Sequence, residues 1–213
     1  MLYPQEAAVV AGCVEKRRLE FAAGRRCARK ALAGLGIIGF PLLPGPDRAP
    51  IWPSGSVGSI THTDGCPRGY CGVAVAERGT TRGLGIDAEP RLPLPAELWS
   101  RVLDEHEQRE ASAADEPGIQ ARLVFSAKET TYKALYSIFK QFLEFSDVHI
   151  ETRPEDGVFL ANLVGEATGI RPSNLKLLGR LVIDEELIVT TMVLPATGFP
   201  LVQEGLSLHH VPC

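Results

Sequence analysis

The sequence predicts an α+β fold made of two similar subdomains that lie side by side. Each half of the chain has the same order of elements, a long helical stretch followed by strand-like runs. A proline-rich segment, Pro90 to Pro95, separates the halves and is typical of a linker. We therefore expect an N-terminal subdomain at residues 1–92, a C-terminal subdomain at residues 93–195 and an irregular tail at residues 196–213, with antiparallel sheets covered by helices.

The first half is expected to hold one long helix and three strands. An apolar residue recurs every four positions through Glu15–Leu35, which predicts a helix that buries the stripe Leu19, Ala23, Cys27, Ala31 and Leu35. Phe40–Gly58 is rich in proline and glycine and is expected to be an ordered loop. Strands are expected at Val57–His62, Tyr70–Glu77 and Leu84–Glu89. The turn pairs Asp64-Gly65 and Arg78-Gly79 between them predict an antiparallel meander.

The second half repeats this order. A charged helical stretch is expected at Ala96–Ala114, a break at Asp115–Gly118 and a longer helix at Ile119–Phe142. Strands are expected at Val148–Thr152, Val158–Val164, Leu178–Ile183 and Leu187–Leu194. Asp184-Glu185-Glu186 fits a hairpin turn between the last two strands.

The composition narrows the class of protein. A net charge of −4 disfavours a non-specific nucleic-acid binder. No run approaches the roughly 18 apolar residues of a membrane span, and residues 1–12 lack the basic start of a signal peptide. Five cysteines, with no C-x-x-C pair, favour free thiols over a disulfide framework or a zinc site. A cytoplasmic location is expected.

Two carboxylates end the third predicted strand. Asp87 and Glu89 are two residues apart, so a strand directs both to one face. Such a pair is stabilised by a hard divalent cation, and Mg²⁺ typically takes one or two carboxylates together with substrate phosphates. Taken alone, the pattern also fits a solvated strand end.

A second acidic feature, Ser126-Ala127-Lys128-Glu129, has two interpretations. S-x-x-E is the pattern of a helix-capping box, in which the serine caps the helix and the glutamate reaches back. A functional role for Glu129 is the alternative. In either case helical spacing places Glu129, Lys133 and Tyr136 on nearly one face, with Lys128 pointing elsewhere.

Basic residues gather in the first predicted helix, at Lys16, Arg17, Arg18, Arg25, Arg26, Arg29 and Lys30. The cluster suits a multiply phosphorylated ligand, because arginine grips phosphate oxygens in pairs. A solvated helix face and a short nucleic-acid tract are the alternatives. Thr61 and His62, near a strand end, could also bind a phosphate or could be structural.

Four segments together form a specific set: Gly24–Arg29 with Ala31-Leu32, Trp52-Pro53 with Gly58–His62, Gly85–Glu89, and Phe125–Glu129 with Tyr132-Lys133. The combination of G-I-D-x-E with a later S-x-K-E-x-x-Y-K carries most of the specificity. On these motifs the chain resembles the 4'-phosphopantetheinyl transferases that serve non-ribosomal peptide, polyketide and siderophore synthesis. That family fold is a pseudo-dimer of two α+β halves with the cofactor between them.

The resemblance implies roles for individual residues. Asp87, Glu89 and Glu129 match the Mg²⁺ ligands, and Glu129 also matches the proposed general base. Lys133 matches a lysine that contacts a coenzyme A phosphate and completes the catalytic set with Asp87 and Glu129. The remaining expected contacts to coenzyme A are Thr61, His62 and Arg25, with Arg17, Arg29 and Arg48 as further candidates.

The resemblance also implies a reaction and partners. The serine hydroxyl of an apo acyl or peptidyl carrier protein attacks the β-phosphate of coenzyme A, and 3',5'-ADP leaves. A monomer that binds neither nucleic acid nor membrane is expected. A non-catalytic coenzyme A or nucleotide sensor and a Mg²⁺-dependent phosphohydrolase are the alternatives. The presence of all three acidic residues favours the enzyme over the sensor.

Overall fold

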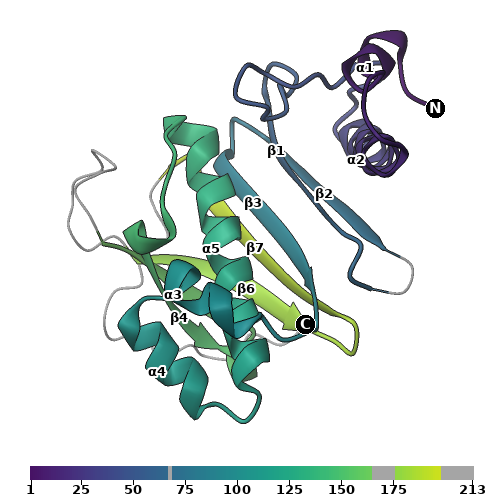
Figure 1. Ribbon diagram of the computed structural model, residues 1–213. Helices are drawn as coiled ribbons and strands as arrows, with labels where there is room; N and C mark the ends of the chain where they lie inside the picture. The colour runs from purple at the N-terminus through teal and green to yellow at the C-terminus, as the bar shows by residue number, and fades with distance from the viewer. Residues whose placement is uncertain (67–68, 165–175, 198–213) are drawn as a thin grey trace.

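The computed structural model describes residues 1–66, 69–164 and 176–197 (Figure 1). The helices of the first half are α1 (Pro4–Val9) and α2 (Glu15–Ala33), and its strands are β1 (Ser56–Thr63), β2 (Tyr70–Glu77) and β3 (Thr81–Pro90). The second half begins with a 3-10 turn, Ala96–Leu98, and the helices α3 (Trp99–Val102), α4 (Glu105–Ala113) and α5 (Pro117–Phe139). It continues with β4 (Val148–Arg153), β5 (Val158–Leu163), β6 (Lys176–Ile183) and β7 (Leu187–Pro195), with further 3-10 turns at Phe145–Asp147 and Pro154–Asp156.

The strands form two antiparallel sheets, which confirms the predicted α+β class. β1 and β2 form a two-stranded hairpin, and the other sheet has the order β3-β7-β6-β5-β4. Asp184 Oδ1 accepts hydrogen bonds from the amides of Glu186 and Leu187, so the predicted hairpin between β6 and β7 is confirmed. α2 lies against the hairpin, and α5 covers β3 and its sheet (Figure 1).

The predicted β1-β2-β3 meander is wrong, because β3 pairs with β7 through its backbone. β3 still lies beside β1, but side chains fill the space where a backbone ladder would form. The Ile86 amide donates to Ser59 Oγ at 3.1 Å, and the Ala88 amide donates to Thr61 Oγ1 at 2.9 Å. Two hydroxyls of β1 therefore satisfy the open edge of β3 and join the two sheets.

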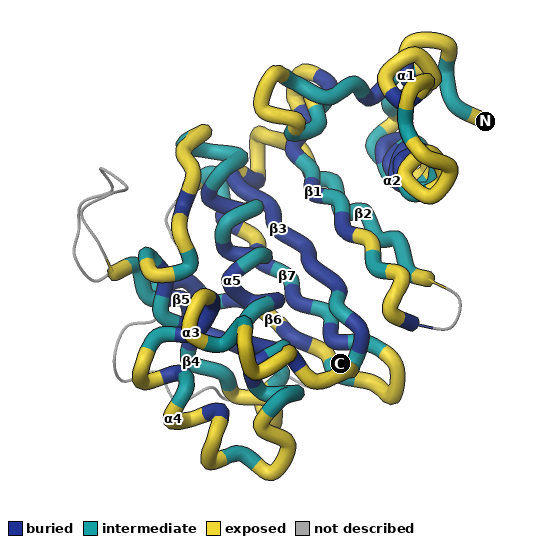
Figure 2. Tube along the Cα trace, viewed as in Figure 1, coloured by how far each residue is buried: buried dark blue, intermediate teal, exposed yellow. Residues whose placement is uncertain are grey.

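α2 buries a different face from the predicted one. Leu19 is 64% exposed, whereas the buried stripe is Phe21, Gly24, Arg25, Ala28 and Leu32 (Figure 2). The difference arises from Arg25, whose guanidinium stacks 3.7 Å from the centre of the Phe21 ring and whose Nε donates to the Leu42 carbonyl. A pattern based on apolar residues cannot include a buried arginine that has such partners.

The predicted helix at Ala96–Ala114 is also wrong as a single element. The chain leaves the helical conformation at Leu103, and Asp104 then caps α4, where its Oδ1 accepts from the amides of His106 and Glu107 at 2.8 Å each. An aspartate in this position satisfies the first free amides of a new helix. The break therefore comes from a capping residue inside a charged run.

α5 supplies most of the core that covers the larger sheet. Leu123, Ala127, Ala134 and Leu135 are buried against residues such as Ile150, and the helix ends at Lys140, which has a left-handed backbone. Ser126 lies in the middle of α5 and is fully buried, so the capping-box interpretation is wrong. The four cysteines in the described segments are free thiols, whereas Cys213 and most of the predicted tail lie outside them. Within the described residues, each helix is too short or too polar to span a bilayer.

Candidate active site

Asp87 is the centre of a buried polar group at the interface between the two sheets. Its side chain is buried, and Oδ2 accepts a hydrogen bond from Ser126 Oγ at 2.9 Å. Oδ1 lies 2.6 Å from Lys133 Nζ and 3.3 Å from Thr61 Oγ1. Residues from β1, β3 and α5 therefore meet at one carboxylate.

The close approach of α5 to β3 depends on glycine at position 85. A Cβ atom there would overlap the Thr130 carbonyl and lie 3.0 Å from the Ala134 amide nitrogen. Behind Asp87, Ser126 Oγ and Thr130 Oγ1 both bond to Thr190 Oγ1 of β7, at 2.8 and 2.7 Å. The glycine of the G-I-D-x-E motif thus lets the backbone of α5 approach β3, and the buried hydroxyls fix the position of α5 along the strand.

Glu89 is half-buried and pairs with Arg122 of α5 at 2.8 Å. Burial raises the pKa of Glu89, the Asp87 carboxylate raises it further, and Arg122 opposes both effects. Arg122 is not among the site residues expected from the motifs. The signal that could have found it is its helical spacing, because Arg122, Ser126, Glu129 and Lys133 recur every three to four residues.

Glu129 has no hydrogen-bond or ion-pair partner among the residues that the structure describes. Burial raises its pKa, the Lys133 ammonium lowers it, and the Asp87 carboxylate raises it. A half-buried carboxylate near another carboxylate is costly unless a cation compensates. Its oxygens, with those of Asp87 and Glu89, are the donor type that Mg²⁺ prefers. Among the described residues, however, these three carboxylates do not form a group whose ligand atoms all lie within 4.8 Å of one another.

Lys133 also borders a cavity of about 290 Å³ between the two halves. The cavity lies between the 47–50 loop, β1 and α5, and its lining includes Arg48, Trp52, Ser59 and Tyr136. Of the predicted coenzyme A contacts, Arg48 and Lys133 therefore share one cavity beside the acidic residues. A charged cavity next to a carboxylate group can hold a phosphorylated ligand.

The other predicted contacts lie elsewhere. Thr61 and His62 point to opposite faces of β1, so Thr61 supports Asp87 whereas His62 faces α2, 3.3 Å from Glu20. His62 lines a second cavity of about 700 Å³ between α2 and the hairpin, together with Lys16 and Arg26.

Three arginines of α2, all predicted contacts of coenzyme A, are bonded within the first half. Arg17 lies 3.4 Å from Glu20, and Arg29 pairs with the buried Glu6 at 2.8 Å. Arg25 is buried against Phe21, and burial lowers its pKa to about 10. The structure brings Asp87, Lys133 and Thr61 into direct contact but does not bring these three arginines to the same cavity.

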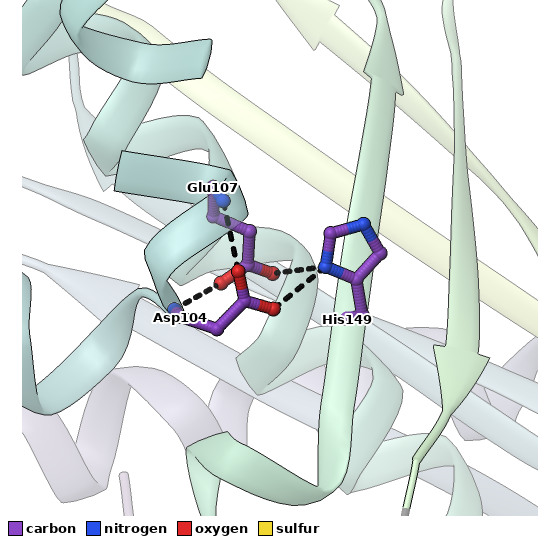
Figure 3. Close-up of side chains that lie close together, drawn as sticks. All are labelled: Asp104, Glu107 and His149. Carbon is purple, nitrogen blue, oxygen red and sulfur yellow. Dashed lines mark hydrogen bonds and ion pairs between the residues drawn. The ribbon is translucent and has the colours of Figure 1, made fainter. Parts of the chain in front are cut away.

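A separate group of ligand-type side chains lies on the far side of α5. The group consists of Asp104, Glu107 and His149. One carboxylate oxygen or ring nitrogen from each of these side chains lies within 4.8 Å of the other two (Figure 3). Each acid is already bonded, because Asp104 Oδ2 lies 2.7 Å from His149 Nδ1 and Glu107 accepts from the Ile150 amide at 2.7 Å. The buried Lys128 ammonium lies 2.7 Å from Glu107 and supplies the positive charge. We interpret this group as a structural network that fastens α4 to β4 and α5.

Comparisons with known proteins agree with the motifs. Residues 5–76 match the 4'-phosphopantetheinyl transferase N-terminal domain, and residues 83–190 match the 4'-phosphopantetheinyl transferase superfamily. The chain is 42% identical to 4'-phosphopantetheinyl transferase Svp of Streptomyces mobaraensis, over 92% of this chain and 80% of Svp. It is 39% identical to 4'-phosphopantetheinyl transferase PptT of Mycobacterium tuberculosis, over 90% of this chain and 85% of PptT.

Proposed function

Because this chain belongs to the 4'-phosphopantetheinyl transferase family, we propose that coenzyme A is its donor, that Mg²⁺ assists the transfer, and that 3',5'-ADP is released. The chain is a transferase that delivers phosphopantetheinyl groups to carrier proteins. The acceptor in this proposal is a serine hydroxyl of an apo acyl or peptidyl carrier protein.

The observation that carries the proposal is the pairing of Asp87 with Lys133 next to Glu129, whose carboxylate has no ion-pair partner within the described part of the chain. Asp87, Glu89 and Glu129 would hold the magnesium ion, and the bound ion would neutralise charge on the diphosphate. The fixed partners of Asp87, namely Ser126 and Thr61, orient its carboxylate before any ligand arrives.

Glu129 takes the proton of the carrier serine in this mechanism. A cavity of about 80 Å³ adjoins Glu129 and is lined mainly by apolar groups, including Tyr132, Phe142 and Leu143.

Lys133 and Arg48 bind the phosphates of coenzyme A from two sides of the 290 Å³ cavity. His62 and Arg25 are the proposed contacts for the remaining phosphate, with Arg17 and Arg29 as supporting residues. For Arg25 this role requires its free Nη atoms, because Nε is bonded to Leu42. Thr61 contributes through Asp87. We further propose that the enzyme acts as a cytoplasmic monomer with two functional halves and does not bind nucleic acid.

Mass spectrometry of an apo-carrier incubated with coenzyme A and Mg²⁺ tests the proposal. The carrier should gain the mass of one phosphopantetheine, and Glu129→Gln should abolish the gain without changing the melting temperature. Glu155→Gln, at an exposed position, serves as the matched control. Phosphate release without carrier modification would identify a phosphohydrolase, and coenzyme A binding without either reaction would identify a sensor.

A further inference from the structure

The cavity that holds Arg48 and Lys133 has walls from two distant parts of the chain. One wall is the 44–50 loop, which leads into β1, and the other is α5. Arg48 comes from the loop, whereas Lys133 comes from the helix. A ligand gripped by both residues therefore requires the loop to keep a fixed position relative to α5.

One hydrogen bond crosses the mouth of this cavity. The Tyr136 hydroxyl, one helical turn after Lys133, donates to Asp47 Oδ2 in the loop. This bond raises the pKa of Tyr136 to about 12 and lowers the pKa of Asp47, so the bond joins a neutral phenol to a charged carboxylate at neutral pH. Hydrogen bonds to an ionised acceptor are stronger than bonds between neutral groups.

Asp47 also determines the conformation of the loop. Its other oxygen, Oδ1, accepts from the Ala49 amide at 3.0 Å, and the Arg48 amide donates to the Gly45 carbonyl at 2.9 Å. Pro44 and Pro50 pair as an isolated bridge that closes the base of the loop. Both carboxylate oxygens of Asp47 thus have a partner, one within the loop and one on α5.

Arg48 itself has a backbone φ of +65°, in the left-handed region that residues with a side chain rarely adopt. Such a conformation persists where surrounding contacts hold it, and it is frequent at ligand-binding positions. The contacts around it here are those of Asp47, the bond from the Arg48 amide to the Gly45 carbonyl and the Pro44–Pro50 bridge. The conformation turns the loop so that Arg48 joins the lining of the cavity.

We propose that Asp47 and Tyr136 form a positioning pair, which fixes Arg48 opposite Lys133 so that the two basic residues grip the phosphates of the donor. The inference rests on the proposed function, since it takes coenzyme A as the ligand. Asp47 and Tyr136 act through Arg48 and need not touch the reacting atoms.

Tyr136→Phe removes the bond and keeps the ring. It should raise both the KM and the Kd for coenzyme A by roughly fivefold, as expected for the loss of one such hydrogen bond, and leave kcat within about twofold. Its melting temperature should match that of wild type, because the bond lies at the surface. Asp47→Asn, which keeps an acceptor oxygen but loses the charge, should have a smaller effect. Ser112→Ala, which removes a hydroxyl of α4 that, among the described residues, bonds only to the Gln108 carbonyl, is the control and should change neither constant.

A double-mutant cycle separates positioning from a merely structural role. If Tyr136 acts through Arg48, then Arg48→Ala and the double variant Arg48→Ala with Tyr136→Phe should bind coenzyme A equally well. Multiplicative effects of the two changes, or an unchanged Kd in Tyr136→Phe, would overturn the inference. Calorimetry measures the Kd for coenzyme A without turnover. If the wild-type chain binds coenzyme A but leaves the carrier unmodified, the result would count against the proposed transfer reaction. It would not count against the positioning role of Asp47 and Tyr136.

Discussion

Lys133 Nζ lies 2.6 Å from Oδ1 of Asp87, so a lysine of α5 and an aspartate of β3 form an ion pair at the centre of the site. The two residues are 46 positions apart in the chain. The pair also influences its neighbours. The pKa values of Glu129 and Glu89 are raised by burial, and the Lys133 ammonium opposes this rise in both.

Removing this ammonium should change the pH dependence of the reaction. In Lys133→Met the pKa of Glu129 should rise, because burial and Asp87 already raise it and the opposing charge is lost. Glu129 must be unprotonated to act as a base, so the acid limb of the kcat/KM profile should move to higher pH. Lys133→Arg keeps the charge and should leave the limb in place. If the acid limbs of the kcat/KM profiles coincided in wild type and Lys133→Met, that result would contradict the role of Glu129 as the base.

Gly85→Ala should destabilise the protein. The new Cβ would overlap the backbone of α5 at Thr130, which cannot move without displacing the helix from β3. We expect a loss of about 3 kcal/mol or more in the free energy of unfolding, measured by urea denaturation. Gly79→Ala is the control, because a Cβ there meets no atom within 4 Å. Equal stability of the two variants would show that α5 does not require this close contact.

Lys128→Met should break a buried ion pair. The side chains of Lys128 and Glu107 are 2% and 0% exposed. In the variant, the buried Glu107 carboxylate would lose the ammonium group that balances its negative charge. The expected loss is about 3–5 kcal/mol in the free energy of unfolding. Lys176→Met removes a half-exposed pair with Glu151, at 3.9 Å, and should cost less than about 1 kcal/mol. A small loss in Lys128→Met would argue instead for the interpretation of Asp104, Glu107 and His149 as a cation site.

Asp104 should give the stability a specific pH dependence. Burial opposes ionisation, but the Glu107 amide and His149 outweigh it, and the pKa of Asp104 is lowered. A lowered pKa stabilises the folded state above the unfolded pKa of about 3.9, and this contribution disappears as the pH falls through the folded value. The stability difference between wild type and Asp104→Asn should therefore be largest near neutral pH and shrink in acid. In the exposed control Asp156→Asn the difference should stay small throughout, and a pH-independent difference for Asp104→Asn would refute the argument.

Local spacing predicted which candidate residues share a strand end or a helical face. Asp87 and Glu89 share a strand end, and Glu129 and Lys133 share a helical face, because the periods of strands and helices are fixed by backbone geometry. Arg122 shares the helical spacing of Glu129 and Lys133, but only the packing of α5 on β3 makes it the partner of Glu89. The buried face of α2 was mispredicted because Arg25 is satisfied by Phe21 and Leu42, the latter from a loop that follows the helix.

The sequence by itself determined the α+β class and most of the strands and long helices, and it identified the candidate acidic and basic residues that stay a prediction, since all of these depend on periodicity and on motifs within short segments. Only the tertiary structure decided that β3 joins β7, that Ser126 is a buried support for Asp87, and that Tyr136 bonds to Asp47. The physical reason is that each of these contacts joins residues far apart in the chain, and their partners are chosen by packing and hydrogen bonding across elements.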